Sequence, residues 1–178
     1  MSKKQINNLI KSFKKTALRA KRINFDCLEI HMAHGYLLHQ FFSPLSNVRT
    51  DDYGGSFKNR SKLLIEVTKE IRKIWPKNRI LGARITGSDH MKNGLSIKDS
   101  VRLAKNLKKV GVDYVSVSSG GIVPVTKMNE QEGFRSKMAS IIKKESKITT
   151  TTSGMFTKHS TVVKLINDKK IDFITIAR

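Results

Sequence analysis

The feature that most constrains the fold is a regular alternation of helical and extended patterns along the 178 residues. Apolar residues recur at spacings of three and four in several segments, which predicts amphipathic helices over residues 3–21, 56–75, 96–110, 134–144 and 157–168. Short apolar runs rich in β-branched residues predict strands over residues 25–31, 79–86, 112–118, 148–152 and 172–176. We therefore expect one α/β domain over residues 1–178 with a parallel sheet.

Two parallel architectures fit this order: a doubly wound open sheet and part of a (β/α)8 barrel. A dinucleotide-binding doubly wound sheet carries a glycine-rich fingerprint after its first strand, and this sequence has none there. Polar residues of interest instead fall at the C-terminal ends of several strands, at His31, Arg84, Ser118 and Gly154. Active sites of barrels are assembled from such strand ends, so this distribution favours a partial barrel.

The composition is strongly basic. The net charge is +21, from 35 Lys and Arg against 14 Asp and Glu. Nucleic-acid binding is one interpretation, because basic residues neutralise phosphates. The lysines are spread over every predicted helix, however, and the aromatic residues do not alternate with them as a base-stacking surface requires. We interpret the charge as solvated helix surface, and keep a non-catalytic basic module that binds nucleic acid or other anionic polymers as the alternative function.

Cysteine content and hydropathy exclude several further classes. Cys27 is the one cysteine, so a disulfide framework within the chain and a cysteine metal cluster are excluded. Cys27 stands inside a predicted strand, where we expect it in the core. The sequence has no run of about 18 apolar residues and no signal-peptide core at its N-terminus. We expect a cytoplasmic protein with no membrane partner.

The sharpest local feature is the segment from His31 to Tyr36, directly after the first predicted strand. His31 and His34 could be metal ligands, but they are too few alone and would need acidic partners, of which Asp89 is the obvious one. They could also be core histidines, although two together past a strand end are unusual. As paired hydrogen-bond donors they could hold a carbonyl oxygen, with Tyr36 as a proton source. Their spacing alone does not decide among these roles.

A longer motif supplies a family resemblance. The stretch EIHMAHGYLLHQFFSPLSNVRTDDYGGSFKNR, which contains both histidines, resembles the signature of the old yellow enzyme family, the NADH:flavin oxidoreductases. The SPLSN wording is most similar to the branch that includes bacterial NADPH dehydrogenases. The likeness continues more weakly through ARITGSDH, DYVSVSSGG, TSGMF and the terminal ITIAR, and so covers essentially the whole chain.

The resemblance implies a (β/α)8 barrel that binds FMN at the C-terminal face of its strands. It implies that NADPH or NADH passes hydride to the flavin, which passes it to an activated alkene such as an enone. His31 and His34 would then hydrogen-bond the substrate's carbonyl oxygen, and Tyr36 would correspond to the proton donor. This role agrees with the physical expectation that donors aimed at developing negative charge stabilise a transition state. On this interpretation the site holds no metal.

The resemblance also implies residues that bind the cofactor. Arg84 stands on a predicted inner strand, where an arginine is costly unless it is paired. A structural salt bridge is one interpretation, and the resemblance favours a position beside the flavin's N1–C2=O region. Gly154, Ala177 and Arg178 would contact the FMN phosphate, although a turn glycine is an equally good interpretation of Gly154.

The length of the chain sets a further expectation. A complete barrel takes about 250 residues, and the resemblance places this chain over about strands four to eight of the eight-stranded barrel. We expect a truncated form that lacks the N-terminal strands and the last helix. Its open sheet would expose an apolar inner face and two edges. Marginal stability is therefore expected, together with a homo-oligomer or a complementing N-terminal half as partner.

Overall fold

The computed structural model describes residues 1–124 and 131–176. Within them is one five-stranded sheet, in which every neighbouring pair of strands is parallel. Its strands are β1 (Cys27–Met32), β2 (Ile80–Thr86), β3 (Tyr114–Ser118), β4 (Thr149–Thr152) and β5 (Phe173–Ile174). Each strand overlaps one of the runs from which the sequence predicts it, so the prediction of a parallel α/β sheet is confirmed.

Six helices connect or precede these strands in the described residues. They are α1 (Lys3–Arg22), α2 (Leu37–Phe42), α3 (Phe57–Ile74), α4 (Ile97–Lys109), α5 (Ser136–Ser146) and α6 (His159–Asn167). Local signals set several of their ends. At the start of α4, for example, Ser96 and Asp99 form a capping box, in which each side chain accepts the other residue's backbone N–H. Among the described residues, no helix is both long and apolar enough to cross a membrane.

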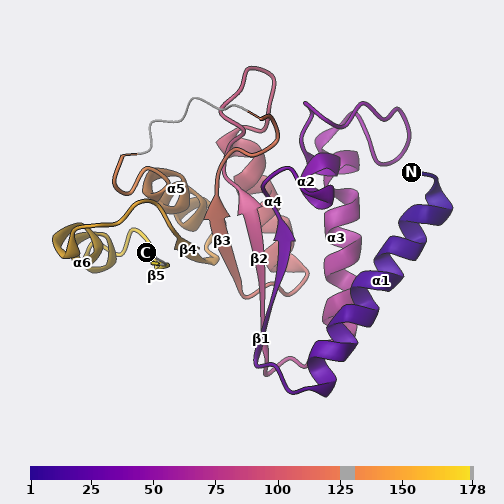
Figure 1. Ribbon diagram of the computed structural model, residues 1–178, viewed down its shortest axis with the longest axis horizontal. Helices are drawn as coiled ribbons and strands as arrows, with labels where there is room; N and C mark the ends of the chain where they lie inside the picture. Colours follow the sequence, from indigo (N-terminus) through magenta and orange to yellow (C-terminus); the bar gives the residue numbers. More distant parts are fainter. Residues whose placement is uncertain (125–130, 177–178) are drawn as a thin grey trace.

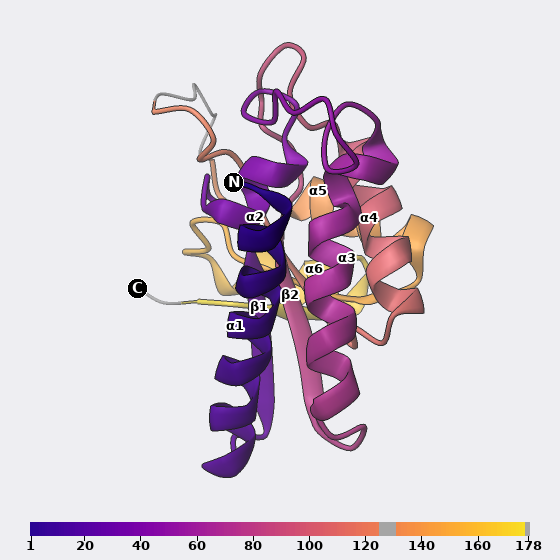
Figure 2. The same ribbon diagram turned by 90° about the vertical axis from the view of Figure 1, so that its right-hand side faces the viewer.

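The order of the strands distinguishes between the two architectures. The strands lie side by side in the order of the sequence, β1-β2-β3-β4-β5. A doubly wound sheet would reverse its strand order at a switch point, whereas a barrel wall does not. Because parallel crossovers share one hand, successive helices come to lie on the same side. In Figure 1 and Figure 2 the helices follow one another around the sheet, with α1 packed on α3, α3 on α4 and α4 on α5.

The hydrophobic core lies between the sheet and this layer of helices. Alternate residues of the strands are buried on that side, such as Ile30 and Met32 of β1 and Leu81 of β2. They meet the apolar faces of α3 and α4, and the contributing helix residues include Leu63, Leu64, Val67, Ile71, Leu103, Ala104 and Leu107. The core therefore determines which residues of each strand face the helices. The alternate residues of the strand lie on the opposite face of the sheet.

The opposite face, called the inner face below, is largely open. The side chains of Ile80 and Phe173 are 50% and 63% exposed, and Cys27 is exposed as well. These three residues help to line an open cavity of about 450 Å³, together with Asp113, Tyr114, Thr149 and Thr151. The expectation of a core position for Cys27 was therefore wrong. Its strand is correct, but Cys27 falls on the alternate positions that face away from the helices.

Candidate functional site

Two of the predicted site residues lie next to each other on the inner face. His31 of β1 is in register with Arg84 of β2, which is in register with Ser116 of β3. Residues paired in register across a sheet point to the same face, and the neighbours Ile30 and Met32 are buried on the helix side. His31 and Arg84 therefore both project from the inner face, in the C-terminal half of their strands.

The loop after β1 brings two more of the predicted site residues, His34 and Tyr36, to the same place. The rings of His31 and His34 have their centroids 5.1 Å apart at an interplanar angle of 81°. The rings of His31 and Tyr36 are also 5.1 Å apart, at 61°, and Tyr36 is 63% exposed. Nε2 of His34 lies 2.5 Å from Oγ of Ser118, at the end of β3. The two imidazoles and the phenol thus form one cluster at the strand ends.

The backbone of this loop is held in an unusual conformation. His34 and Gly35 have φ angles of 59° and 73°, in the left-handed region. Gly35 also packs so closely on the loop after β3 that a Cβ atom there would lie 2.1 Å from the carbonyl oxygen of Gly121. Only glycine fits this position without moving the backbone. This close contact fixes the backbone on both sides of Gly35, and with it the directions in which the side chains of His34 and Tyr36 project.

The electrostatic environment keeps both histidines neutral. Partial burial, followed by the nearby cation of Arg84, lowers the pKa of His31. Burial, Arg84 and His31 lower the pKa of His34 to about 4, with a further contribution from Arg135 of the loop before α5. Each ring is therefore neutral near pH 7, with one nitrogen that donates and one that accepts. A neutral pair of this kind can donate to a carbonyl oxygen but carries no charge of its own.

This low pKa gives a direct prediction. Since the ordinary histidine value is 6.5 and that of folded His34 is about 4, the unfolded chain binds more protons between those values. The folded chain should therefore lose stability as the pH falls through that window. An NMR titration of the imidazole protons should find His34 still neutral at pH 5.5. A midpoint near 6.5 for His34 would contradict the described environment.

Comparison with known proteins decides the family. The sequence profile of the NADH:flavin oxidoreductase / NADH oxidase family matches residues 1–178, the entire chain. The chain belongs to this family. The NADPH dehydrogenases of Halalkalibacterium halodurans and Bacillus subtilis are each 39% identical to it over 178 residues, which are 100% of this chain and 52% of each relative. The chain thus spans about half the length of these members of the NADH:flavin oxidoreductase family.

Solved structures agree on the fold. A 2-naphthoyl-CoA reductase in complex with 2-naphthoyl-CoA superposes with a TM-score of 0.90 at 25% identity, covering 98% of this chain and 27% of that one. A morphinone reductase in complex with tetrahydroNAD gives a TM-score of 0.78 at 24% identity, covering 100% of this chain and 46% of that one. These structures are TIM-barrel enzymes, so the five-stranded sheet is part of a barrel, as predicted.

Arg84 provides a test of whether the chain suits the flavin of the NADH:flavin oxidoreductase family. Its Nε atom is buried and has no hydrogen-bond partner among the described residues. A buried donor without an acceptor is costly, which argues for an acceptor supplied by another molecule. The polar ring edge of a flavin carries such acceptors, and Arg84 points toward the same face as His31. The unsatisfied donor of Arg84 therefore fits the cofactor.

The predicted phosphate contacts are less well defined. Gly154 is buried in the loop after β4, and its carbonyl oxygen accepts a hydrogen bond from the backbone N–H of Gly133 at 2.6 Å. A Cβ atom at Gly154 would meet its nearest neighbours at 3.5 Å, an ordinary contact, so space alone does not require glycine there. Ala177 and Arg178 lie outside the described residues. The phosphate-binding role of all three remains a prediction.

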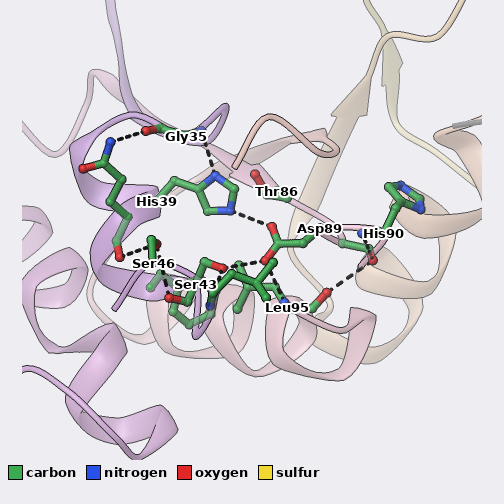
Figure 3. Close-up of polar contacts among 12 residues, drawn as sticks. Gly35, His39, Ser43, Ser46, Thr86, Asp89, His90 and Leu95 are labelled. Atoms are coloured by element: carbon green, nitrogen blue, oxygen red, sulfur yellow. Dashed lines mark hydrogen bonds and ion pairs between the residues drawn. The ribbon is translucent and has the colours of Figure 1, made fainter. Parts of the chain in front are cut away.

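The structure also gives Arg135 and His39 positions near the site that the sequence did not predict. Arg135 donates from Nε to Oγ of Ser119 at 3.0 Å, which sets a second arginine near His34. His39 and Asp89 form a fully buried pair behind the histidine loop, with Nε2 and Oδ1 2.9 Å apart (Figure 3). Within the described residues, no group of three or more His, Cys, Asp or Glu side chains could hold a metal. Asp89, the acidic partner that a metal site would need, is engaged by His39 instead.

One signal in the sequence could have revealed the buried pair. Helix α2 reads LLHQFF, and Leu38, His39, Phe41 and Phe42 are all buried. A histidine in such an apolar helix cannot reach solvent, so it needs a polar partner inside the protein. Spacing along the sequence does not identify that partner, because Asp89 lies 50 residues further along the chain.

Proposed function

We propose that this chain carries the substrate-binding side of an FMN-dependent oxidoreductase site that reduces activated alkenes of the enone type with NADPH or NADH. The observation that carries the proposal is the convergence of His31, His34, Tyr36 and Arg84 on one end of the inner face. Arg84 would hold FMN, whose chemistry when bound would be the transfer of hydride from a reduced nicotinamide to the β-carbon of the alkene. Residues of the chain would polarise the carbonyl group of the substrate and supply the proton.

His31 and His34 act on the substrate's carbonyl oxygen. Each neutral ring presents one N–H donor, and the two rings stand 5.1 Å apart, edge to face, at the same strand ends. As hydride reaches the β-carbon, electron density moves onto the carbonyl oxygen. Two fixed donors stabilise this charge more than they stabilise the neutral ground state, and so lower the barrier. On this role Nε2 of His34 accepts a hydrogen bond from the hydroxyl of Ser118, which orients the ring and leaves its N–H on Nδ1.

Tyr36 completes the reaction by supplying the proton. Its phenol lies beside His31 and is 63% exposed on the open side of the cluster, where a substrate would arrive. Transfer of the phenolic proton to the α-carbon saturates the former double bond, and solvent can then reprotonate the phenol. The net change is the addition of one hydride and one proton across the alkene.

Arg84 would hold the flavin through its buried Nε–H, and this assignment can be tested by binding. Arg84→Met removes the cation together with all of its N–H donors, and should weaken FMN binding by at least about tenfold, the effect of losing a charge-assisted hydrogen bond. Arg102→Met makes the same charge change on α4, where Arg102 stacks on Phe57 outside the site. Fluorescence titration with FMN should leave Arg102→Met unaffected; equal binding by both variants would remove Arg84 from the site.

A second candidate function rests on a lysine-rich cavity. It has a volume of about 490 Å³ and lies beside α5 and β4, where its lining includes Lys143, Lys144, Lys147, Lys169 and Lys170. Asp168 and Asp172 neutralise part of this charge through ion pairs with Lys170 and Lys143. Binding of an anionic polymer here would weaken steeply as salt is raised and would need no flavin. The arrangement of His31, His34, Tyr36 and Arg84 gives no reason to expect such binding, so we rank this function second.

The open inner face supports a partner for the chain. Ile80 and Phe173 expose apolar surface there, whereas monomeric proteins usually cover extended surface of this kind. We propose that the complementary part of the barrel, or a second copy of the chain, packs on this face. Sedimentation velocity of the purified chain distinguishes a monomer from a self-associated form.

A further inference from the structure

A network of buried hydrogen bonds links the loop after β1, which carries His34 and Tyr36, with the loop after β2 (Figure 3). His39 and Asp89 are both 0% exposed. Nδ1 of His39 lies 2.9 Å from the backbone nitrogen of Gly35, which donates to it, and Nε2 lies 2.9 Å from Oδ1 of Asp89. Gly35 belongs to the loop after β1, and Asp89 to the loop after β2. The network therefore connects the C-terminal end of β1, where the two histidines lie, with the C-terminal end of β2, the strand of Arg84.

The contacts define the protonation of His39. A backbone N–H can only donate, so Nδ1 must be the accepting nitrogen and carry no proton. The proton of the neutral ring is then on Nε2, where it is donated to the carboxylate of Asp89. A protonated ring, or a ring with its proton on Nδ1, would place two donors face to face at Gly35. His39 thus works as a neutral, fixed bridge.

Asp89 is itself held from two further directions. Its Oδ2 accepts hydrogen bonds from Oγ of Ser43 at 2.6 Å and from the backbone N–H of Leu95 at 2.8 Å. Burial would raise the pKa of this carboxyl group, but the hydrogen bonds from His39, Ser43 and Leu95 keep it below its ordinary value. The carboxylate is therefore ionised and held in one orientation. Its hydrogen bond with Nε2 in turn fixes the orientation of the His39 ring.

The other end of the bridge is a strained backbone. Gly35 stands between His34 and Tyr36, and both His34 and Gly35 have left-handed φ angles. Helix α2 holds both polar groups of Gly35: His39 accepts from its N–H, and Nε2 of Gln40 donates to its carbonyl oxygen at 2.6 Å. A left-handed non-glycine residue such as His34 persists only when its surroundings impose it. The bridge is one such constraint.

We propose that His39 and Asp89 are positioning residues that fix the loop of His34, Gly35 and Tyr36, and thereby orient the imidazole and the phenol toward the substrate. This role in catalysis rests on the function proposed above. The orientation of the loop does not, because it is a property of the chain without flavin or substrate. The two can therefore be tested separately.

The test is an NMR comparison of the full 178-residue chain and four variants, without flavin or substrate. In the unsubstituted chain, the ring nitrogen shifts should show a proton on Nε2 of His39 and none on Nδ1. Asp89→Asn and His39→Leu should speed exchange of the Gly35 amide by at least about tenfold, since each disturbs its buried acceptor. Both should also shift the ring signals of His34 and Tyr36. His39→Gln, which offers one oxygen acceptor and one N–H donor, should restore part of the protection.

Leu38→Ala is the matched control, because Leu38 is a buried residue of the same helix without a role in the bridge. It should lower overall stability while changing Gly35 no more than other core amides. A proton on Nδ1 of His39 in the unsubstituted chain would overturn the proposal even if a variant fails to fold. So would unchanged Gly35 exchange and unchanged His34 and Tyr36 signals in Asp89→Asn and His39→Leu, or equal changes in Leu38→Ala.

Discussion

Replacement of His31 and His34 together by alanine is expected to slow the reduction of an enone by at least about 100-fold in the flavin-loaded protein, the usual effect of removing fixed donors from a developing oxyanion. Binding of FMN and its reduction by NADPH should change much less, because the imidazoles act on the substrate. Stopped-flow absorbance separates the two half-reactions. The geometric reason is that both neutral rings stand at one strand end, 5.1 Å apart.

His90→Ala is the control for this experiment, since it removes an exposed histidine from the loop after β2, outside the cluster. It should leave both half-reactions within about twofold of the original rates, as expected for a surface substitution away from the site. Equal slowing of flavin reduction and of enone reduction by the double replacement would assign the histidines to the cofactor rather than to the substrate.

Trp75→Ala is expected to lower the free energy of unfolding by about 3–5 kcal/mol, the typical cost of truncating a large buried aromatic residue. Trp75 is 1% exposed at the end of α3, and its Nε1–H donates to the carbonyl oxygen of Ile80 at 3.0 Å. The substitution removes core packing and leaves that carbonyl without its donor. Chemical denaturation followed by circular dichroism measures the change.

Phe173→Ala is the informative comparison for Trp75→Ala. Phe173 is as apolar but lies 63% exposed on the inner face, so its truncation should change the stability of the isolated chain by about 0.5 kcal/mol or less. This contrast tests whether the core lies only between sheet and helices. A loss for Phe173→Ala comparable to that for Trp75→Ala would mean that the inner face is covered, either by a second copy or by another segment.

Much of the fold could be predicted because local patterns and packing agree. The apolar spacing of α3 and α4 is set by the core they share with the sheet, and the capping box at Ser96 marks the start of α4 from sequence alone. Helix α2 was not predicted, since LLHQFF is only six residues long, too short for the spacing of its apolar residues to stand out. Cys27 was misplaced for a related reason: a short strand reveals its existence more readily than which of its faces is buried.

The site could be predicted only in part. The cluster of His31, His34 and Tyr36 follows from their closeness in sequence just past a strand, and Arg84 joins them because neighbouring parallel strands are in register. The bridge from His39 to Asp89 depends on a contact between two loops, which spacing along one chain does not encode. Arg135 reaches the cluster in the same way, through the packing of the loop before α5 beside the end of β3.

The proposed ene-reductase site is tested most directly by the absorption spectrum of the purified chain after incubation with FMN and desalting, recorded without oxygen. We expect a retained flavin band that bleaches when NADPH is added and recovers when an enone is supplied. Loss of the flavin on desalting, or a bleached band that no activated alkene restores, would contradict the claim that the residues gathered on the inner face of this chain form an ene-reductase site.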